Sequence, residues 1–114
     1  MNESDVRLKL IDPALKKEWN ADRQIFTEYY FTDGEIVVRK GLHTRKKPKK
    51  ADYLLMYKRD MPIAIVEAKD SKHTIEAGLQ QAMDYAIALD VPFAYSSNGK
   101  GFAEHDFTTG KVRR

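Results

Sequence analysis

The chain has 114 residues, of which 42% are apolar and 32% are charged, with a net charge of +3 and no cysteine. This length suits one compact domain, and the composition excludes a disordered chain, a disulfide scaffold and a zinc site built on thiolates. No apolar run approaches the roughly 18 residues that span a bilayer, and the N-terminus lacks the layout of a signal peptide. We therefore expect a cytoplasmic protein that makes no membrane contact.

Two short helices are expected first along the chain. The segment 2–11 has the apolar spacing of an amphipathic helix, and Asn2 is available to cap it. Pro13 is tolerated at the first position of a helix, so a second helix should begin there and end near Asn20.

Strands follow these helices. The segments 23–31 and 35–41 are rich in β-branched and aromatic residues, and Asp33-Gly34 between them predicts a hairpin. The segments 51–58 and 62–70 predict a second pair of strands.

The C-terminal third begins with a helix expected over 73–90, which Pro92 would end. A further strand is expected over 92–97, and Asn98-Gly99 suggests a turn after it. The order of helix, strands, helix and strand predicts the α/β class, with a mixed sheet in a single domain.

The most basic segment is 39–50, which contains seven lysines or arginines and no acid. Such a segment attracts polyanions, but a solvated loop that keeps the protein soluble would have the same composition. Its candidate DNA-binding residues are Arg45, Lys46, Lys47, Lys49 and Lys50.

The clearest candidate site is the charged end of the apolar strand "PIAIVEAKD". Glu67 and Lys69 share one face because successive strand residues alternate, and Asp52 opens the preceding strand. Two converging carboxylates favour a hard divalent cation, and a lysine beside it can act on the attacking water or neutralise a phosphate. A strand end exposed to solvent can also carry Glu-x-Lys without any function, so the prediction of a metal site depends on Asp52 lying beside Glu67 and Lys69.

One geometric condition decides whether these residues meet. A plain five-residue loop from Lys58 to Pro62 would pair Asp52 with Ala68, which would place Asp52 and Glu67 on opposite faces. We therefore predict an even loop or a bulge, near the loop or near Asp52.

At this point the sequence resembles a known family. Asp52 followed by Glu67-Ala68-Lys69 resembles the PD-(D/E)XK nuclease motif, although Ala51 stands where the motif name has proline. Gln81 and Tyr85 resemble the QxxxY element of one branch of that superfamily. A longer resemblance, to the N-terminal nuclease domain of the R (HsdR) subunit of type I restriction enzymes, runs through "NESDVRLKLIDPAL", "YFTDGEIVV", "KKADYLLMYK", "PIAIVEAKD", "GLQQAMDYA" and "VPFAYSSNGKGF".

This resemblance implies a restriction-endonuclease-like fold, in which helices flank a mixed β-sheet, and a catalytic set of Asp52, Glu67 and Lys69. It implies Mg²⁺, or Mn²⁺, held by Asp52, Glu67, the carbonyl of Ala68 and Glu3. Lys69 would act on the nucleophilic water.

The resemblance also implies that Gln81 and Tyr85, one helical turn apart, contact DNA phosphate or support Lys69. The other interpretation of this pair is an exposed glutamine and a half-buried tyrosine with no role in DNA binding.

The implied function is that of a type I site-specific deoxyribonuclease that cleaves double-stranded DNA, with methyltransferase and specificity subunits as partners. The chain has no G-x-x-x-x-G-K-[ST] loop, so we expect residues 1–114 to be a single endonuclease domain separated from its motor, with ATP acting only through that motor. Two alternatives remain open: a DNA-binding module on the same fold without catalysis, and a junction resolvase or RecB-like nuclease.

Overall fold

A computed structural model gives the fold. It describes residues 1–32 and 48–114, and only the backbone of 37–39 and 42–44 in between. Three of the residues expected to bind DNA, Arg45, Lys46 and Lys47, lie outside the described residues. None of the helices in the described part of the chain combines the length and the apolar character needed to cross a bilayer.

The N-terminal helices form one continuous run. It consists of α1 (Glu3–Val6), a π-helical turn η1 (Arg7–Ile11) and α2 (Asp12–Glu18). The predicted cap is confirmed, because the side chain of Asn2 accepts a hydrogen bond from the Asp5 N–H. Pro13 has no N–H to continue an α-helical ladder, and the wider π turn carries the chain past it without a break.

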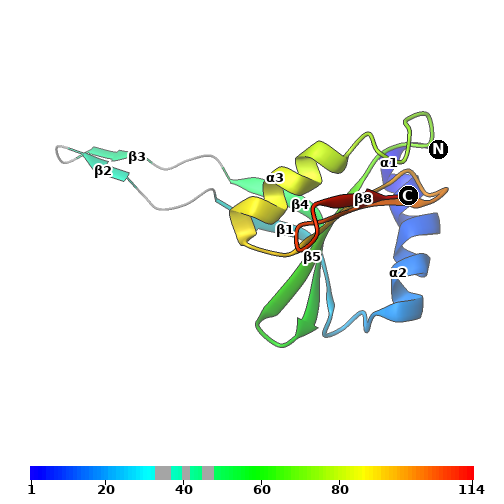
Figure 1. Ribbon diagram of the computed structural model, residues 1–114, viewed down its shortest axis with the longest axis horizontal. Helices are drawn as coiled ribbons and strands as arrows, with labels where there is room; N and C mark the ends of the chain where they lie inside the picture. Colours follow the sequence, from blue (N-terminus) through cyan, green and yellow to red (C-terminus); the bar gives the residue numbers. More distant parts are fainter. Residues whose placement is uncertain (33–36, 40–41, 45–47) are drawn as a thin grey trace.

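Six strands form the main sheet, in the spatial order β1-β4-β5-β6-β7-β8. Their bounds are β1 (Ile25–Phe31), β4 (Lys49–Lys58), β5 (Met61–Ala68), β6 (Phe93–Ser97), β7 (Phe102–Asp106) and β8 (Lys111–Arg113). Only β5 and β6 are parallel, and helix α3 (Leu79–Leu89) connects them, as a parallel pair requires (Figure 1). The expectation of a mixed sheet flanked by helices is confirmed.

The hairpin predicted between 23–31 and 35–41 is wrong. Strand β1 pairs with β4 over six residue pairs, whereas β2 (Val37–Arg39) pairs with β3 (Leu42–Thr44) over three. The local turn signal cannot reveal that β4 offers β1 a longer partner with an apolar centre. Strand β8 was not predicted either.

The predicted helix over 73–90 begins later than expected, at Leu79, and turns occupy 75–78. It ends at Leu89, because Asp90 takes the left-handed conformation with φ of 55°.

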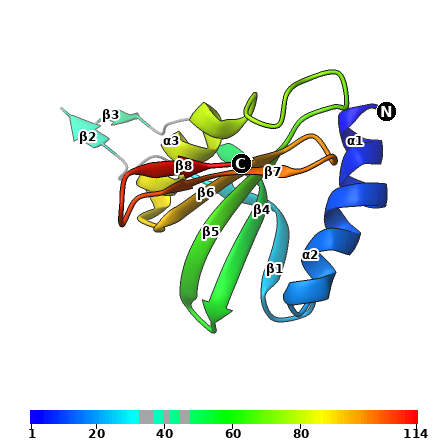
Figure 2. The ribbon, with the colours of Figure 1, turned by 45° about the vertical axis from the view of Figure 1, so that its right-hand side comes forward.

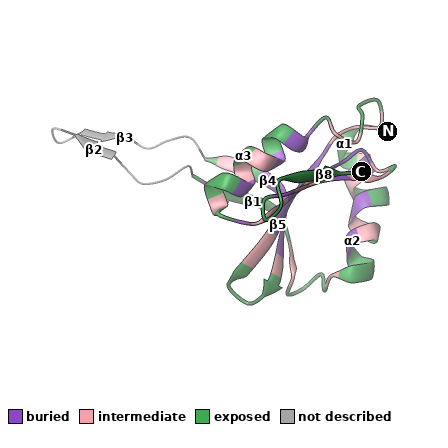
Figure 3. Cartoon of the chain, in the orientation of Figure 1, coloured by how far each residue is buried: buried purple, intermediate pink, exposed green. Residues whose placement is uncertain are grey.

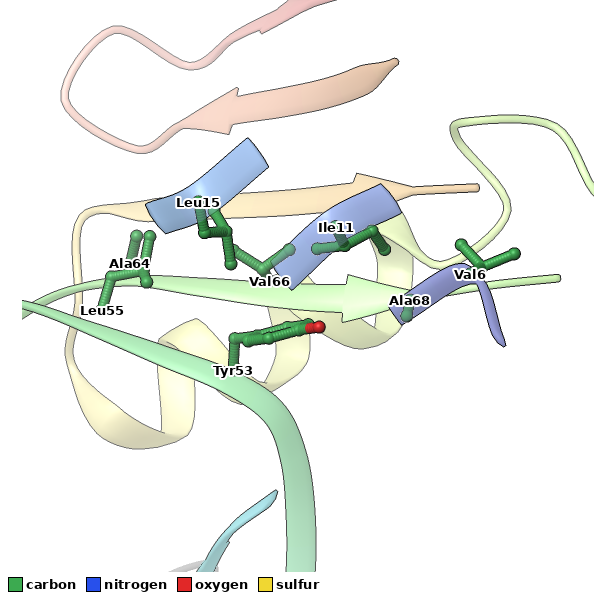
Figure 4. Close-up of a cluster of buried hydrophobic side chains, with 8 residues drawn as sticks. All are labelled: Val6, Ile11, Leu15, Tyr53, Leu55, Ala64, Val66 and Ala68. Atoms are coloured by element: carbon green, nitrogen blue, oxygen red, sulfur yellow. The ribbon is translucent and has the colours of Figure 1, made fainter. Parts of the chain in front are cut away.

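Helices cover both faces of the sheet. The run α1–η1–α2 packs on one face, where Val6, Ile11 and Leu15 meet side chains of β4 and β5 (Figures 2 and 4). Helix α3 packs on the other face, where its Ala82 and Ala86 meet strand residues such as Ile65. The strands β4 and β5 contribute to both cores, so the middle of this pair is held rigidly.

Candidate functional site

The β4–β5 hairpin satisfies the geometric condition derived from the sequence. Its loop has two residues, 59–60, and the register is irregular close to that loop. The strands then run in step to the pair Tyr53–Val66, and the next step of this register puts Asp52 level with Glu67. The predicted even loop is therefore present.

Asp52 and Glu67 are both buried and are tied to each other's strands. The backbone N–H of Asp52 donates a hydrogen bond of 2.8 Å to Oε2 of Glu67. The backbone N–H of Ala68 donates one of 2.8 Å to Oδ2 of Asp52. Because each carboxylate has one oxygen fixed by a neighbouring strand, its orientation is set before any ligand arrives.

The electrostatic consequence is visible at Glu67. Burial of its side chain, with the nearby charge of Asp52 as the second cause, raises the pKa of Glu67 from 4.5 to about 8. Glu3 adds to the rise, while the backbone hydrogen bond from Asp52 and the charge of Lys69 oppose it. Two carboxylates are thus held together where a second negative charge is unfavourable.

Lys69 follows the last residue of β5 and remains attached to the sheet. Its backbone N–H donates a hydrogen bond of 2.8 Å to the carbonyl of Ser97 on β6. Its side chain begins on the same side as that of Glu67, because a Cβ added at Gly78 would lie 3.4 Å from Cβ of Glu67 and 3.4 Å from Cγ of Lys69. The acid and the base predicted to share a face do so.

Gly78 lets the start of α3 approach these residues. Its N–H donates a hydrogen bond of 2.9 Å to Oγ of Ser96, which is buried and lies opposite Glu67 in the sheet. A Cβ at this position would lie only 2.9 Å from the same Oγ. Gly78 and Ser96 were not predicted as site residues, and the one sequence signal for a close approach was a glycine at the start of a helix.

Arg7 and Glu28 were also missed. The Arg7 guanidinium lies with Nη1 3.8 Å from Oδ1 of Asp52 and 3.5 Å from Oε1 of Glu28. Both come from elements distant in the sequence from Asp52, and nothing in the pattern of residues signals that they meet there.

Glu3, the fourth predicted metal ligand, lies near enough for its charge to help raise the pKa of Glu67. Across residues 1–32 and 48–114, no three His, Asp or Glu side chains gather closely enough to hold a metal ion together. The donors that the structure brings together are the carboxylates of Asp52 and Glu67, and the backbone carbonyl of Ala68 stays a predicted ligand. Mg²⁺ is usually held by one or two carboxylates, with waters completing its shell, so this oxygen-only set fits that ion.

Gln81 is exposed and Tyr85 is half-buried against the core, and their side chains contact each other on α3. The Gln81 amide donates a hydrogen bond of 2.7 Å to the Tyr85 hydroxyl. The Tyr85 ring meets Phe31 edge-on at 5.0 Å, and Nζ of Lys49 lies 6.0 Å from its centroid. Three of the residues predicted to bind DNA, Gln81, Tyr85 and Lys49, are thus brought together beside the start of β4.

Lys50 is turned elsewhere, with its Nζ 3.7 Å from Oε1 of Glu28.

A mixed sheet with helices on both faces, and a carboxylate pair with a lysine at the end of its central hairpin, defines a protein of restriction-endonuclease-like fold. The family model described as the type I restriction enzyme R protein N terminus matches residues 21–112. The type I restriction enzyme EcoAI endonuclease subunit of Escherichia coli is 39% identical over 112 residues. The chain belongs to this family of R protein N-terminal regions.

A solved structure agrees with this assignment. A fragment described as an HsdR subunit of a type I restriction enzyme from Vibrio vulnificus YJ016 superposes with a TM-score of 0.83 at 43% identity, covering 99% of this chain and 22% of that chain. The alignment with the Escherichia coli subunit covers 97% of this chain but only 14% of that protein. The chain thus spans a small part of the length of the relatives it matches.

Proposed function

We propose that this chain is a Mg²⁺-dependent DNA endonuclease domain and serves as the cleavage module of a type I restriction enzyme R subunit. The observation that carries the proposal is the convergence of Asp52 and Glu67, each with one oxygen fixed by the other's strand, beside Lys69. Double-stranded DNA is the proposed substrate, and methyltransferase and specificity subunits are the proposed partners of the whole R subunit, whose motor would use ATP.

Each residue has a distinct proposed role. Oδ1 of Asp52, Oε1 of Glu67 and the carbonyl of Ala68 would hold Mg²⁺ or Mn²⁺. When bound, such an ion lowers the pKa of a water and neutralises charge on a phosphate. Lys69 orients the attacking water and stabilises negative charge as it builds on the phosphate oxygens.

A second set of residues would hold the DNA. Gln81, Tyr85 and Lys49 form a polar and cationic surface that starts one helical turn from the close contact between Gly78 and Lys69. Such a surface contacts phosphates and fixes the position of the duplex, and it carries no sequence preference.

The test is plasmid nicking with Mg²⁺ or Mn²⁺, comparing the wild type with Lys69→Ala and Asp52→Ala, and with Asp60→Asn as a control at the far end of the same hairpin. We expect nicking by the wild type and the control only. Equal cutting by the wild type and both site variants would overturn the assignment.

Calorimetric titration with Mn²⁺ separates metal binding from cleavage. Asp52→Ala should abolish Mn²⁺ binding, whereas Lys69→Ala should retain it. DNA binding without nicking at any metal concentration, by this chain and by the whole R subunit with its partners, would instead favour a DNA-binding module without catalysis.

A further inference from the structure

A partly buried arginine, Arg7, lies beside the carboxylate pair, on the face of the sheet that the N-terminal helical run covers. Arg7 belongs to η1, and its guanidinium stacks over the ring of Tyr53 with its central carbon 5.0 Å from the ring centroid. Its Nη2 donates a long hydrogen bond of 3.5 Å to the carbonyl of Asp52. The hydroxyl of Tyr53 is in turn bound to Asp12, so the ring that supports Arg7 is fixed.

Arg7 acts on Asp52 mainly through its charge, because the distances between them are too long for strong hydrogen bonds. A guanidinium that orients a carboxylate normally makes two short parallel hydrogen bonds, whereas Nη1 of Arg7 is 3.8 Å from Oδ1 of Asp52. Nε of Arg7 is buried and has no hydrogen-bond partner among the described residues. The N–H of Ala68, at 2.8 Å, is the group that fixes the orientation of Asp52.

Glu28 lies within ion-pair distance of both Arg7 and Lys50. Its Oε1 lies 3.5 Å from Nη1 of Arg7 and 3.7 Å from Nζ of Lys50. Glu28 also has φ of 51°, a left-handed conformation that is rare for a strand residue. This conformation falls in β1 between the residues that pair with Tyr53 and Ala51, next to Asp52 in the sheet.

We propose that Arg7 is the resident counter-ion of Asp52, that it competes with the metal for the carboxylate pair, and that Glu28 weakens this competition by partly neutralising Arg7. The inference rests on the proposed metal-dependent function and assigns a positioning pair to the same site. Without a metal, Arg7 offsets part of the repulsion between the two buried carboxylates. With a metal, a fixed positive charge a few ångströms away weakens the binding of a second cation.

The experiment is calorimetric titration of Mn²⁺ into the intact chain, carried out at low salt. Removal of this partly buried positive charge should tighten Mn²⁺ binding about tenfold in Arg7→Gln, because like charges at this range repel strongly beside two buried carboxylates. Arg7→Lys keeps the charge and should bind within about threefold of the wild type. Glu28→Gln should weaken binding about two- to threefold, since its carboxylate is half exposed and screened.

Two controls define the mechanism. Glu18→Gln removes an exposed acid at the far end of the helical run from Arg7 and should leave Mn²⁺ affinity unchanged. In the double variant of Arg7→Gln with Glu28→Gln, the second substitution should lose most of its effect, because Glu28 acts through Arg7. A merely structural role for Arg7 would predict weaker Mn²⁺ binding in Arg7→Gln and no rescue by lysine.

The outcomes separate this inference from the proposed function. If the wild type binds no Mn²⁺, both are overturned. If the wild type binds Mn²⁺ and Asp52→Ala does not, but Arg7→Gln leaves the affinity unchanged or weakens it, only the role of Arg7 is overturned. If Arg7→Gln does not fold, Glu28→Gln decides the matter, because an unchanged or tighter affinity in that exposed variant also contradicts the proposal.

Discussion

The two ends of the β4–β5 hairpin carry similar residues and differ in their surroundings. At one end, Asp52, Glu67 and Lys69 lie where the helical run and α3 both approach the sheet. At the other end, Lys58, Arg59 and Asp60 are exposed, and Figure 3 shows this end of the hairpin in the colour of exposed residues. That far end lines an open groove of about 780 Å³.

The difference shows what burial does to charge. At the exposed end, water and salt screen the acids and bases, so ion pairs between them contribute little to the stability of the fold. At the buried end each carboxylate is fixed by a backbone N–H, and burial together with a neighbouring charge raises the pKa of Glu67. Composition alone does not distinguish the two ends, whereas the packing of helices over one of them does.

The largest expected contrast between the ends is in catalysis. Glu67→Gln should reduce DNA nicking in Mg²⁺ by at least about 10²- to 10³-fold, the effect of removing one preorganised group that stabilises a transition state. Asp60→Asn, at a left-handed position that asparagine tolerates, should cut like the wild type. Single-turnover nicking rates measure both, and equal losses in the two variants would remove the distinction.

The second contrast concerns pH and stability in the absence of metal. Between pH 4.5 and about 8 the folded protein keeps a proton on Glu67 that the unfolded chain has released, so stability should fall as the pH rises through this window. The slope should be at most about 1.4 kcal/mol per pH unit from this group. Urea unfolding in EDTA measures it.

Glu67→Gln should remove this part of the pH dependence, and Asp60→Asn should leave it in place because its exposed carboxylate loses little hydration on folding. An unchanged slope in Glu67→Gln would show that Glu67 is not the group that titrates.

The third contrast is in packing. Gly78→Ala would push a methyl group to within 2.9 Å of Oγ of Ser96, so we expect the free energy of unfolding to fall by about 1 to 3 kcal/mol. Gly101→Ala is the matched control, because its Cβ would meet only Ile75, at 3.8 Å. Thermal unfolding compares the two variants, and equal melting temperatures would contradict the close approach of α3.

The smallest contrast is in the salt dependence of DNA binding. Neutralising Lys49 and Lys50 should lower the slope of log affinity against log salt by about one for each charge that contacts a phosphate. Neutralising Lys58 and Arg59 at the exposed end should leave that slope unchanged. Fluorescence anisotropy with duplex DNA at several salt concentrations measures both, and an unchanged slope in the first variant would return these lysines to a role in solubility.

Much of the site was predictable because it depends on local rules. Strand alternation placed Glu67 and Lys69 on one face, and the requirement for an even loop followed from counting residues between Asp52 and Glu67. The α/β class also followed from the order of elements. These inferences needed only the pairing of two consecutive strands, β4 and β5, and no knowledge of the other neighbours in the sheet.

The rest required the tertiary structure. Strand β1 pairs with β4, which lies well beyond the next segment in the sequence, so that Ile25 lies opposite Leu55. The local turn signal at Asp33-Gly34 favoured the wrong strand. The left-handed conformation of Glu28 has no signature in its residue type, and Arg7 reaches Asp52 only because the helical run crosses the sheet at that point. Long-range placement of single side chains is what the sequence pattern lacks.

The β2–β3 hairpin has a consequence for how such proteins diversify. Within the described residues its backbone bonds only to itself, and Figure 1 shows it standing away from the six-stranded sheet. Because β2 and β3 pair only with each other among the described residues, a hairpin of different length or charge would leave every strand of the main sheet with its own neighbours. Exchange of this hairpin can therefore change what the domain contacts without changing the residues proposed to cleave DNA.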